Sequence, residues 1–594
     1  MPTDHPSQRI LVCVAWPYAS GDRHLGHVAG AYLPPDIYAR YQRLRGNDVC
    51  MVSGSDTHGT PITVRAAQEG VTPADIVARY HGRFVQSFKD LGLSFDLFTH
   101  TDTQNHWDVT HELFENHLAN GYIYQDRQQQ PYCLIDQRFL ADRYIEGTCP
   151  ICSYPDARGD QCDNCGNTLD PMDLIGPRCK ICGQSQIEIR ETEHFFFDLG
   201  KASPELAAWL SQGKEHWRSA VINYARQQAE SGGLHGRAIT RDIDWGISIP
   251  LPGYENKVIY VWYDAVIGYF SATREICALQ GQPESWRDWW LDPDVRSIYF
   301  IGKDNIPFHS IYWPAMLIAD GRGLNLPYDV PANEYLNIED KKISTSRRWT
   351  IDLPDFLTRY DPDPLRYALT INAPETRDVN FTWDEFVRRN NDELVATWGN
   401  LVNRTLGFAY SRFDGEVPSP GAYDDSDRAL LAASETAFAE VGAELESVRL
   451  KLALIRAMEL AHAANRYLNE KAPWSQIKED PAAAATTIYV TLQVIDRLKV
   501  LLNPFLPFTT EQLHGFLGYQ GSIFGNLHIE EVTDARGSRP VLRYDGSQLE
   551  ARWAPGNLPP GQPLQKPAAL YKKLDLSVID AERERLLEHL GQVD

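Results

Sequence analysis

The chain has 594 residues, more than one hydrophobic core accommodates, so about three to four domains are expected. Hydrophobic residues make up 43% and charged residues 23%, a balance typical of a soluble globular protein. No apolar run reaches the roughly 18 residues that indicate a membrane span, and the start lacks the apolar core of a signal peptide, so we expect a cytoplasmic location. A net charge of −23 argues against a uniformly basic nucleic-acid-binding protein, but not against a local basic patch.

The N-terminal region alternates between strand-like and helix-like segments. Residues 10–15 form an apolar, partly β-branched run typical of a buried parallel strand. A helical stretch begins near His24, and Pro34–Pro35 is expected to interrupt it. A second strand is expected at 49–53, and Thr72 before a proline is typical of a helix start. This alternation predicts a doubly wound α/β domain.

The alternation stops near Gly121. Residues 122–240 look irregular and contain the clustered cysteines, whereas strand-like runs return at 258–262 and 297–301. A domain inserted into a split nucleotide-binding fold explains this order.

The last third of the chain is predicted to be mainly helical. Residues 384–517 predict long helices rich in alanine and leucine, with one break at 503–507. The tail contains a proline-rich stretch at 554–567 and a charged amphipathic helix near 577–590.

A His-Leu-Gly-His motif, His24 to His27, follows the first predicted strand and opens a helix. A helix N-terminus offers free N–H groups and the positive end of the helix dipole, which favour a phosphate. Two imidazoles one turn apart can donate hydrogen bonds to a phosphoryl group in the transition state, and Gly26 lets a nucleotide pack closely. The alternative is a pair of core histidines, and segments further along the chain favour the phosphate site.

Residues 17–27 resemble the first signature of class I aminoacyl-tRNA synthetases, and Ala15–Tyr18 resembles the methionine branch of that family. Residues 342–346, Lys-Ile-Ser-Thr-Ser, resemble the second signature, Lys-x-Ser-Lys-Ser. With the segments below, the resemblance extends to about Leu517. It implies catalytic roles for His24, His27 and Lys342, and ATP binding by His24, Gly26, His27, Lys342, Ser344 and Thr345.

Thr345 departs from the family pattern, which has its second lysine at this position. The resemblance implies that the loop closes over ATP and that its lysines draw charge from the pyrophosphate. One positive charge is therefore missing here, and either Lys341 or Arg347 is a candidate replacement.

Three further segments, 54–61, 260–265 and 301–309, resemble the methionine enzyme. The resemblance assigns the methionine site to Ala15, Trp16, Tyr18, Asp56, Trp262, Ala265, Tyr269 and His309. A carboxylate such as Asp56 suits the substrate ammonium, and aromatic rings suit a thioether. Physics alone does not select methionine over leucine or isoleucine. Core packing is the alternative role for Trp262 and Tyr269.

Two Cys-x-x-Cys pairs, Cys149 with Cys152 and Cys162 with Cys165, predict a closed tetrahedral zinc site with a structural role. Disulfides or redox pairs are poor alternatives in the cytoplasm. A third pair, Cys179 with Cys182, needs two further ligands to complete a metal site. Cys133 and Asp136 have the right spacing, so a second zinc held by Cys133, Asp136, Cys179 and Cys182 is a hypothesis.

The resemblance implies that the helical region reads the tRNA anticodon. Asn400 and Arg404 lie one turn apart on one helix face. Trp474 is expected to stack on an anticodon base, although packing into the end of the bundle is the alternative.

Together these features predict ATP-dependent activation of L-methionine, with Mg²⁺ accompanying ATP, and transfer to tRNA(Met). The residues after Tyr544 are too few for an appended dimerisation barrel, which favours a monomer. The alternatives are another class I synthetase, a small nucleotidyltransferase, or a zinc-knuckle RNA-binding protein without activity, which only Thr345 favours. The expected α/β multidomain architecture has a split Rossmann-like catalytic domain at 1–121 and 241–325, an inserted zinc-knuckle domain at 122–240, a linking domain at 326–383, an α-helical anticodon-binding domain at 384–545 and a tail at 546–594.

Overall fold

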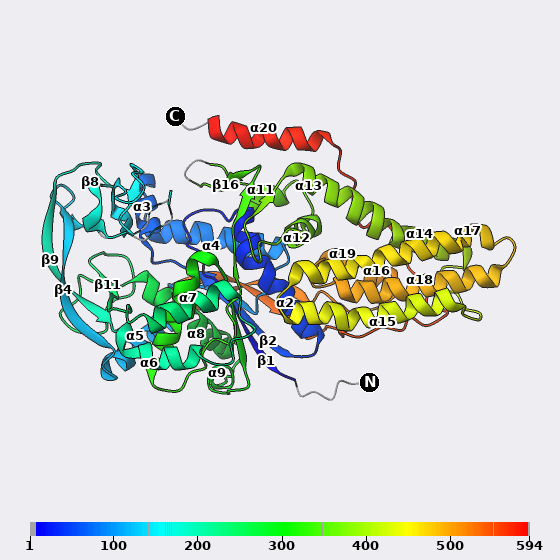
Figure 1. Ribbon diagram of the computed structural model, residues 1–594, viewed down its shortest axis with the longest axis horizontal. Coiled ribbons are helices and arrows are strands. Elements are labelled where there is room, and N and C mark those ends of the chain that lie inside the picture. The colour runs from blue at the N-terminus through cyan, green and yellow to red at the C-terminus, as the bar shows by residue number, and fades with distance from the viewer. Residues whose placement is uncertain are drawn as a thin grey trace.

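The computed structural model describes residues 7–140, 142–160, 162, 164–165, 167, 169–345, 348–550 and 552–591. The molecule is elongated, with an α/β body at one end and long helices at the other (Figure 1). Among the described residues, no helix is both long and apolar enough to cross a membrane.

A seven-stranded sheet lies at the centre of the body, in the order β14-β13-β1-β2-β3-β19-β18. Its strands are β1 (Arg9–Val14), β2 (Asp48–Ser55), β3 (Leu97–His100), β13 (Arg296–Gly302), β14 (Ala332–Asn333), β18 (Asn526–Asp534) and β19 (Gly537–Asp545). The first five strands of that order run parallel, which confirms the predicted α/β fold. Side chains of β1 alternate between the faces, so Val12 joins one buried apolar cluster and Cys13 the other.

Helices cover both faces of the sheet. Ile37 and Phe84 pack on the Val12 face, whereas Leu113 and Ile267 pack on the Cys13 face. The covering helices are α2 (Leu33–Leu44), α3 (Thr60–Glu69), α4 (Pro73–Asp90), α5 (Gln104–Ala119), α8 (Val261–Leu279), α9 (Trp286–Trp290) and α10 (Trp313–Asp320).

The expected interruption at Pro34–Pro35 is wrong. The short helix α1 (Leu25–His27) continues through a π-helical turn, Val28–Tyr32, directly into α2. Pro34 has no N–H to bond the carbonyl of Gly30, but Asn333 donates to that carbonyl from β14 at 2.7 Å. The prolines therefore lie in the first turn of α2 without ending the helical path.

The expected strand at 258–262 is also corrected. Only Val258–Ile259 of the run 258–262 is a strand, β12, which pairs with β11 (Thr240–Arg241), because α8 begins at Val261. A short apolar run does not distinguish a buried strand from the first turn of a buried helix.

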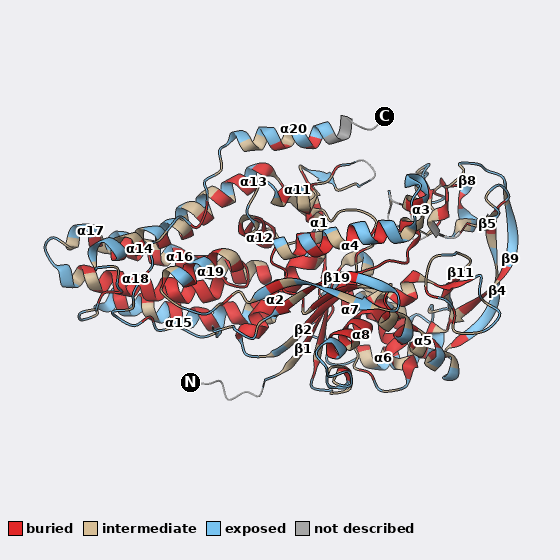
Figure 2. Ribbon diagram, turned by 180° about the vertical axis from the view of Figure 1, so that it is seen from behind, coloured by how far each residue is buried: buried red, intermediate tan, exposed pale blue. Residues whose placement is uncertain are grey.

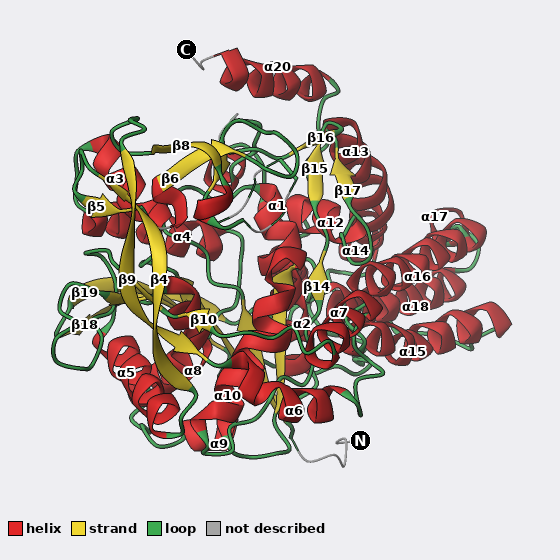
Figure 3. Ribbon diagram, turned by 60° about the vertical axis from the view of Figure 1, so that its left-hand side comes forward, coloured by secondary structure: helices red, strands yellow, loops and turns green. Residues whose placement is uncertain are grey.

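The inserted region is more regular than the sequence indicated. It contains a long antiparallel ribbon of β4 (Ile123–Cys133) and β9 (Ile187–Phe197), which extends on the side away from the long helices (Figure 3). Most of β4 is exposed on both faces, so the sequence lacks the alternation that marks a strand. The other elements are β5 (Arg138–Phe139), β6 (Ile145–Thr148), β7 (Ala157–Arg158), β8 (Ile175–Cys179), α6 (Leu199–Leu210), α7 (Ser219–Glu230) and β10 (Arg237–Ala238).

The linking region pairs β15 (Leu336–Ile338) with β16 (Lys341–Lys342) and β17 (Val379–Phe381), and adds α11 (Leu353–Leu357) and α12 (Pro362–Ile371). The long helices follow, with the predicted break between α18 and α19 confirmed. They are α13 (Trp383–Arg388), a π-helical segment (Arg389–Gly399), α14 (Asn400–Arg412), α15 (Asp425–Glu446), α16 (Leu450–Lys471), α17 (Pro473–Gln476), α18 (Pro481–Leu502) and α19 (Pro507–Phe516); the tail ends with α20 (Ser577–Gly591).

Residues 526–545 differ from the expected helical domain. They form the hairpin β18-β19, and Leu542 of β19 pairs with Phe98 at the edge of the catalytic sheet. The chain thus leaves the body for the helices and then returns to complete the sheet.

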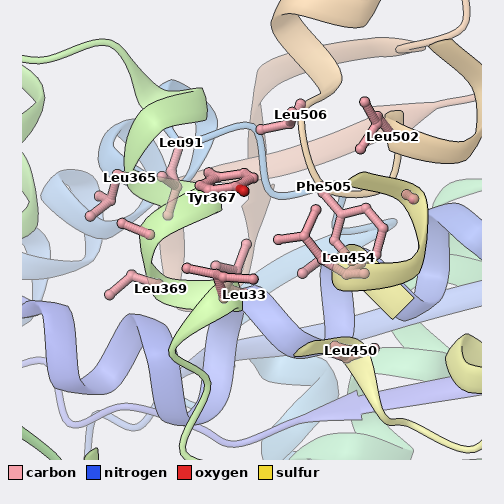
Figure 4. Packing of buried hydrophobic residues seen from close by; sticks show 14 of the residues in the cluster. Leu33, Leu91, Leu365, Tyr367, Leu369, Leu450, Leu454, Leu502, Phe505 and Leu506 are labelled. Atoms are coloured by element: carbon pink, nitrogen blue, oxygen red, sulfur yellow. The ribbon is translucent and has the colours of Figure 1, made fainter. Parts of the chain in front are cut away.

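Apolar side chains of α2, α12, α16 and the connection between α18 and α19 meet where the helices join the body. Figure 4 shows Leu33 of α2, Leu365 of α12, Leu454 of α16 and Phe505 packed together. All four are buried within one continuous cluster, so the helices and the body share a core.

Candidate active site

The first signature lies where β1 leads through a loop into α1. His24 is the N-cap residue, and its Nδ1 accepts from the backbone N–H of His27 at 3.4 Å. In turn, Nδ1 of His27 accepts from the N–H of His24 at 3.3 Å. Because both Nδ1 atoms accept, each ring carries its proton on Nε2. The rings are stacked with centroids 3.6 Å apart, which places two ring donors together.

Both imidazoles are neutral. Burial lowers the pKa of His24 to about 3 and holds the pKa of His27 well below its usual value. The pair therefore offers hydrogen bonds rather than positive charge.

The two signatures touch each other. The N–H of Leu25 donates to the carbonyl of Ile351 at 3.0 Å, and the N–H of Leu353 donates to the carbonyl of Arg23 at 2.8 Å. A Cβ at Gly26 would lie 2.7 Å from Cδ1 of Ile343. Gly26 thus makes room for the second signature, a contact that the sequence did not reveal.

The signature loop leaves β16 at Lys342, whose Nζ lies 5.5 Å from the ring centroid of Tyr335. Lys341 lies over Trp349, at 4.4 Å. Backbone bonds in both directions join Ser344 to Trp349, and Thr345 is exposed. Ser346 and Arg347 lie outside the described residues, so only Lys341 of the two candidate replacements can be placed.

A cavity of about 100 Å³ lies beside this region, and all eight residues that the resemblance assigns to the amino acid line it. The loop after β1 contributes Ala15, Trp16 and Tyr18, and α8 contributes Trp262, Ala265 and Tyr269. The remaining lining residues, not predicted, are Val261, Val266, Asn305 and Phe308. Three of these four fall inside segments that resemble the family, which was the available signal.

Two glycines leave room for the Trp16 indole, which forms one wall of the cavity. A Cβ at Gly54 would lie 2.2 Å from the Trp16 ring, and a Cβ at Gly268 would lie 2.5 Å from it. The indole therefore lies directly against the backbones of β2 and α8.

The inner end of the cavity is polar but uncharged. His309 Nδ1 donates to the carbonyl of Asn305 at 3.0 Å, so its Nε2 accepts from the Tyr269 hydroxyl at 2.7 Å. Burial lowers the pKa of His309 to about 4 and raises the pKa of Tyr269. The Trp262 and Phe308 rings lie 3.9 Å apart at the cavity.

Asp56, which is buried directly after β2, lies near two other ionisable groups, His58 and Asp264. The N–H of His58 donates to its carboxylate at 3.3 Å, and His58 Nδ1 bonds the buried Asp264 at 2.8 Å. Burial, together with the charge of Asp264, raises the pKa of Asp56. Burial alone would lower the pKa of His58, but its contacts with Asp102 and Asp264 raise it to about 9. The imidazolium of His58 thus lies between Asp264, at its Nδ1, and Asp102, 3.8 Å from its Nε2.

The clustered cysteines form two groups that could each hold a metal ion. The first is Cys149, Cys152, Cys162 and Cys165, and the second is Cys133, Asp136, Cys179 and Cys182. In each group the ligand atoms lie within 4.8 Å of one another. Tetrahedral zinc with thiolates at about 2.3 Å needs sulfur atoms about 3.8 Å apart; Sγ of Cys152 and Cys162 are 3.5 Å apart, and Sγ of Cys133 and Cys182 are 3.6 Å apart.

Backbone N–H groups also point at the sulfur atoms. Those of Ile151 and Ile181 donate to Cys149 and Cys179, each at 3.4 Å. Such bonds stabilise thiolates, so both donor sets fit a zinc ion.

At the far end of the helices, Arg404 of α14 lies over the Trp474 ring at 4.7 Å and donates to Asn469 at 3.0 Å. Trp474 is 41% exposed, which contradicts packing into the bundle end. Asn400 is exposed one turn before Arg404.

Comparisons with known proteins agree with this arrangement. Residues 10–406 match the family model "tRNA synthetases class I (M)", and residues 417–533 match "Anticodon binding domain of methionyl tRNA ligase". The chain is 58% identical to the methionine–tRNA ligase of Thermomicrobium roseum, over 98% of this chain and 99% of that protein, and 52% identical to that of Roseiflexus castenholzii, over 97% and 98%. Its structure is similar to that of the Mycobacterium tuberculosis methionyl-tRNA synthetase in complex with methionyl-adenylate, with a TM-score of 0.75 and 26% identity over 96% of this chain and 100% of that chain. The chain therefore belongs to the methionyl-tRNA synthetase family.

Proposed function

We propose that this chain activates L-methionine with ATP, giving methionyl-adenylate and pyrophosphate, and then transfers the methionyl group to the 3′ end of tRNA(Met). One observation carries the proposal. The loop between β1 and α1 lines the cavity with Ala15, Trp16 and Tyr18 and then supplies His24, so the amino acid and phosphate sites share one loop.

In the first step, a methionine carboxylate oxygen attacks the α-phosphorus of ATP in line, and the bond to pyrophosphate breaks. The Nε2–H groups of His24 and His27 donate to the phosphoryl oxygens as charge develops on them. Lys342 stabilises the departing pyrophosphate, and Mg²⁺ enters with ATP as part of the substrate. The attacking carboxylate is already ionised, so no general base is assigned.

In the second step, a hydroxyl of the terminal tRNA adenosine attacks the carbonyl carbon of the adenylate, and AMP leaves. Asp56 binds the substrate ammonium throughout, with His58 offsetting the second carboxylate, Asp264. The thioether of methionine lies among the aromatic rings of the cavity, including Trp262 and Tyr269. The inner end of that cavity carries no charge.

We further propose one structural zinc in each cysteine group. Because protein side chains would fill all four coordination positions of each ion, the ions would stabilise the loops that carry the cysteines and take no part in the reaction. The first is ligated by four thiolates, and the second by three thiolates and the carboxylate of Asp136.

Anticodon recognition is assigned to Asn400, Arg404 and Trp474, whose indole is 41% exposed and so accessible to a base. The enzyme is assigned to the cytoplasm, where charged tRNA is consumed by ribosomes. A monomer is proposed because the tail folds back onto the helices: Leu558 exchanges hydrogen bonds with Gln493 of α18.

The function is tested by ATP–pyrophosphate exchange, measured against each amino acid in turn. Exchange that depends on methionine alone is expected. Exchange with another amino acid, or with none, would contradict the proposal.

Gly26→Ala is expected to lower the rate of exchange at least about tenfold, because the new Cβ collides with Ile343 and displaces the loop. The loss occurs although alanine favours a helix. Adding Ile343→Val, which removes Cδ1, should restore part of the rate, with Ile343→Val alone as the control. A double variant no better than Gly26→Ala would refute this contact.

Metal analysis of the purified chain is expected to give two zinc ions per molecule. Cys179→Ser should lower the value to one, and Cys152→Ser should do so independently. A ratio near one in the unaltered chain would rule out the second site.

Trp474→Ala is expected to weaken methionylation of tRNA, by about tenfold for a lost stacking interaction of 1–3 kcal/mol, while leaving ATP–pyrophosphate exchange unchanged. Trp289→Ala, a partly buried tryptophan in the body, controls for general loss of fold. Equal losses in both assays would remove Trp474 from the anticodon site.

A further inference from the structure

The tail ends in a helix, α20, that lies next to the linking region and α13 (Figures 1 and 3). Most of its surface is exposed (Figure 2). Glu582 and Leu586 are exceptions, because they are only 5% and 3% exposed. A leucine is expected on the buried side of a helix, but a buried carboxylate requires specific partners.

Those partners follow the signature loop in the chain. Arg359 donates to the Glu582 carboxylate with Nε at 2.7 Å and Nη2 at 3.1 Å, and the Tyr360 hydroxyl donates at 2.8 Å. Both residues come directly after α11, into which the signature loop runs. Glu582 thus holds the C-terminal end of the segment that carries the loop.

The next residue of α20 holds the other end. Arg583 Nε donates at 3.0 Å to Glu339, and the same guanidinium pairs with Asp384. Glu339 and Asp340 form the turn between β15 and β16, with left-handed φ angles of 47° and 60°. Such a turn is strained in residues other than glycine and needs support from its surroundings. The second oxygen of Glu339 accepts from the N–H of Trp383 at 2.9 Å, which adds to that support.

This turn fixes the start of the loop. β16 is only two residues long and pairs with β15 directly across the turn, with Lys341 opposite Ile338 and Lys342 opposite Asn337. A shift of Glu339 is therefore passed directly to Lys342. We propose that Glu582 and Arg583 are positioning residues that set the resting position of the signature loop, and hence of Lys342, for the ATP half of the reaction. This inference rests on the proposed function.

The ion pairs of Arg583 contribute little to global stability, whereas the pair of Glu582 with Arg359 is largely buried. Arg583 is 40% exposed, and exposed pairs typically contribute about 1 kcal/mol or less. Any large change in the kinetics of a variant that is folded reports on the loop rather than on unfolding.

The test compares the double substitution Glu582→Gln and Arg583→Gln with Glu584→Gln, an exposed glutamate of the same helix. In ATP–pyrophosphate exchange, we expect kcat/KM for ATP to fall about tenfold in the double variant, while KM for methionine stays within about twofold of the unaltered chain. Circular dichroism should show all three proteins to be folded at the assay temperature.

A second measurement does not depend on activity. Trypsin cleavage at Lys342 and Arg348 should be at least about threefold faster in the double variant than in Glu584→Gln, because the loop is released. An unchanged cleavage rate, or parallel losses in KM for ATP and for methionine, would overturn the inference. If the unaltered chain shows no methionine-dependent exchange, the proposed function fails, and the cleavage rates still decide whether α20 positions the loop.

Discussion

One buried carboxylate, Asp36, joins the elements that follow the two signatures. It bonds Arg40 of its own helix at 3.0 Å and Arg366 of α12 at 2.6 Å, and its other oxygen accepts from the backbone and hydroxyl of Ser94. Arg366 is completely buried and also donates to the carbonyl of Phe505 at 2.9 Å. Burial would raise the pKa of Asp36, but the two guanidinium groups and the two hydrogen bonds from Ser94 together lower it to about 2. A buried ion pair stabilises a fold only when its polar atoms are bonded in this way.

This network explains how distant segments keep one geometry. Asp36 lies on α2, which follows His24, whereas Arg366 lies on α12, which follows the signature loop. Phe505 lies between α18 and α19, so the region proposed to read the anticodon is anchored at the same point. The backbone bonds from Leu25 to Ile351 and from Leu353 to Arg23 then join the segments that carry the two signatures. The side chains of Asp36 and Arg366 are fully shielded from water, which strengthens their electrostatic attraction.

The sequence predicted the chemistry better than the connections. Short motifs located His24 and both cysteine groups, because each role requires particular residue types at fixed spacing. The cavity residues followed from the resemblance to the family. Pro34 was misread because its missing hydrogen bond is replaced by Asn333, which is remote in sequence. The hairpin at 526–545 was missed because membership of a sheet depends on a neighbouring strand rather than on local pattern. His58 and Asp264 were inside recognised segments, but only their approach in space shows that they form a pair.

The central claim is that the network at Asp36 holds the two signatures in their working arrangement. It is tested most directly by ATP–pyrophosphate exchange of Arg366→Ala, assayed at a temperature where circular dichroism shows the variant to be folded. We expect kcat/KM for ATP to fall at least about tenfold, although Arg366 does not line the amino acid cavity. An unchanged kcat/KM in the folded variant would contradict that claim.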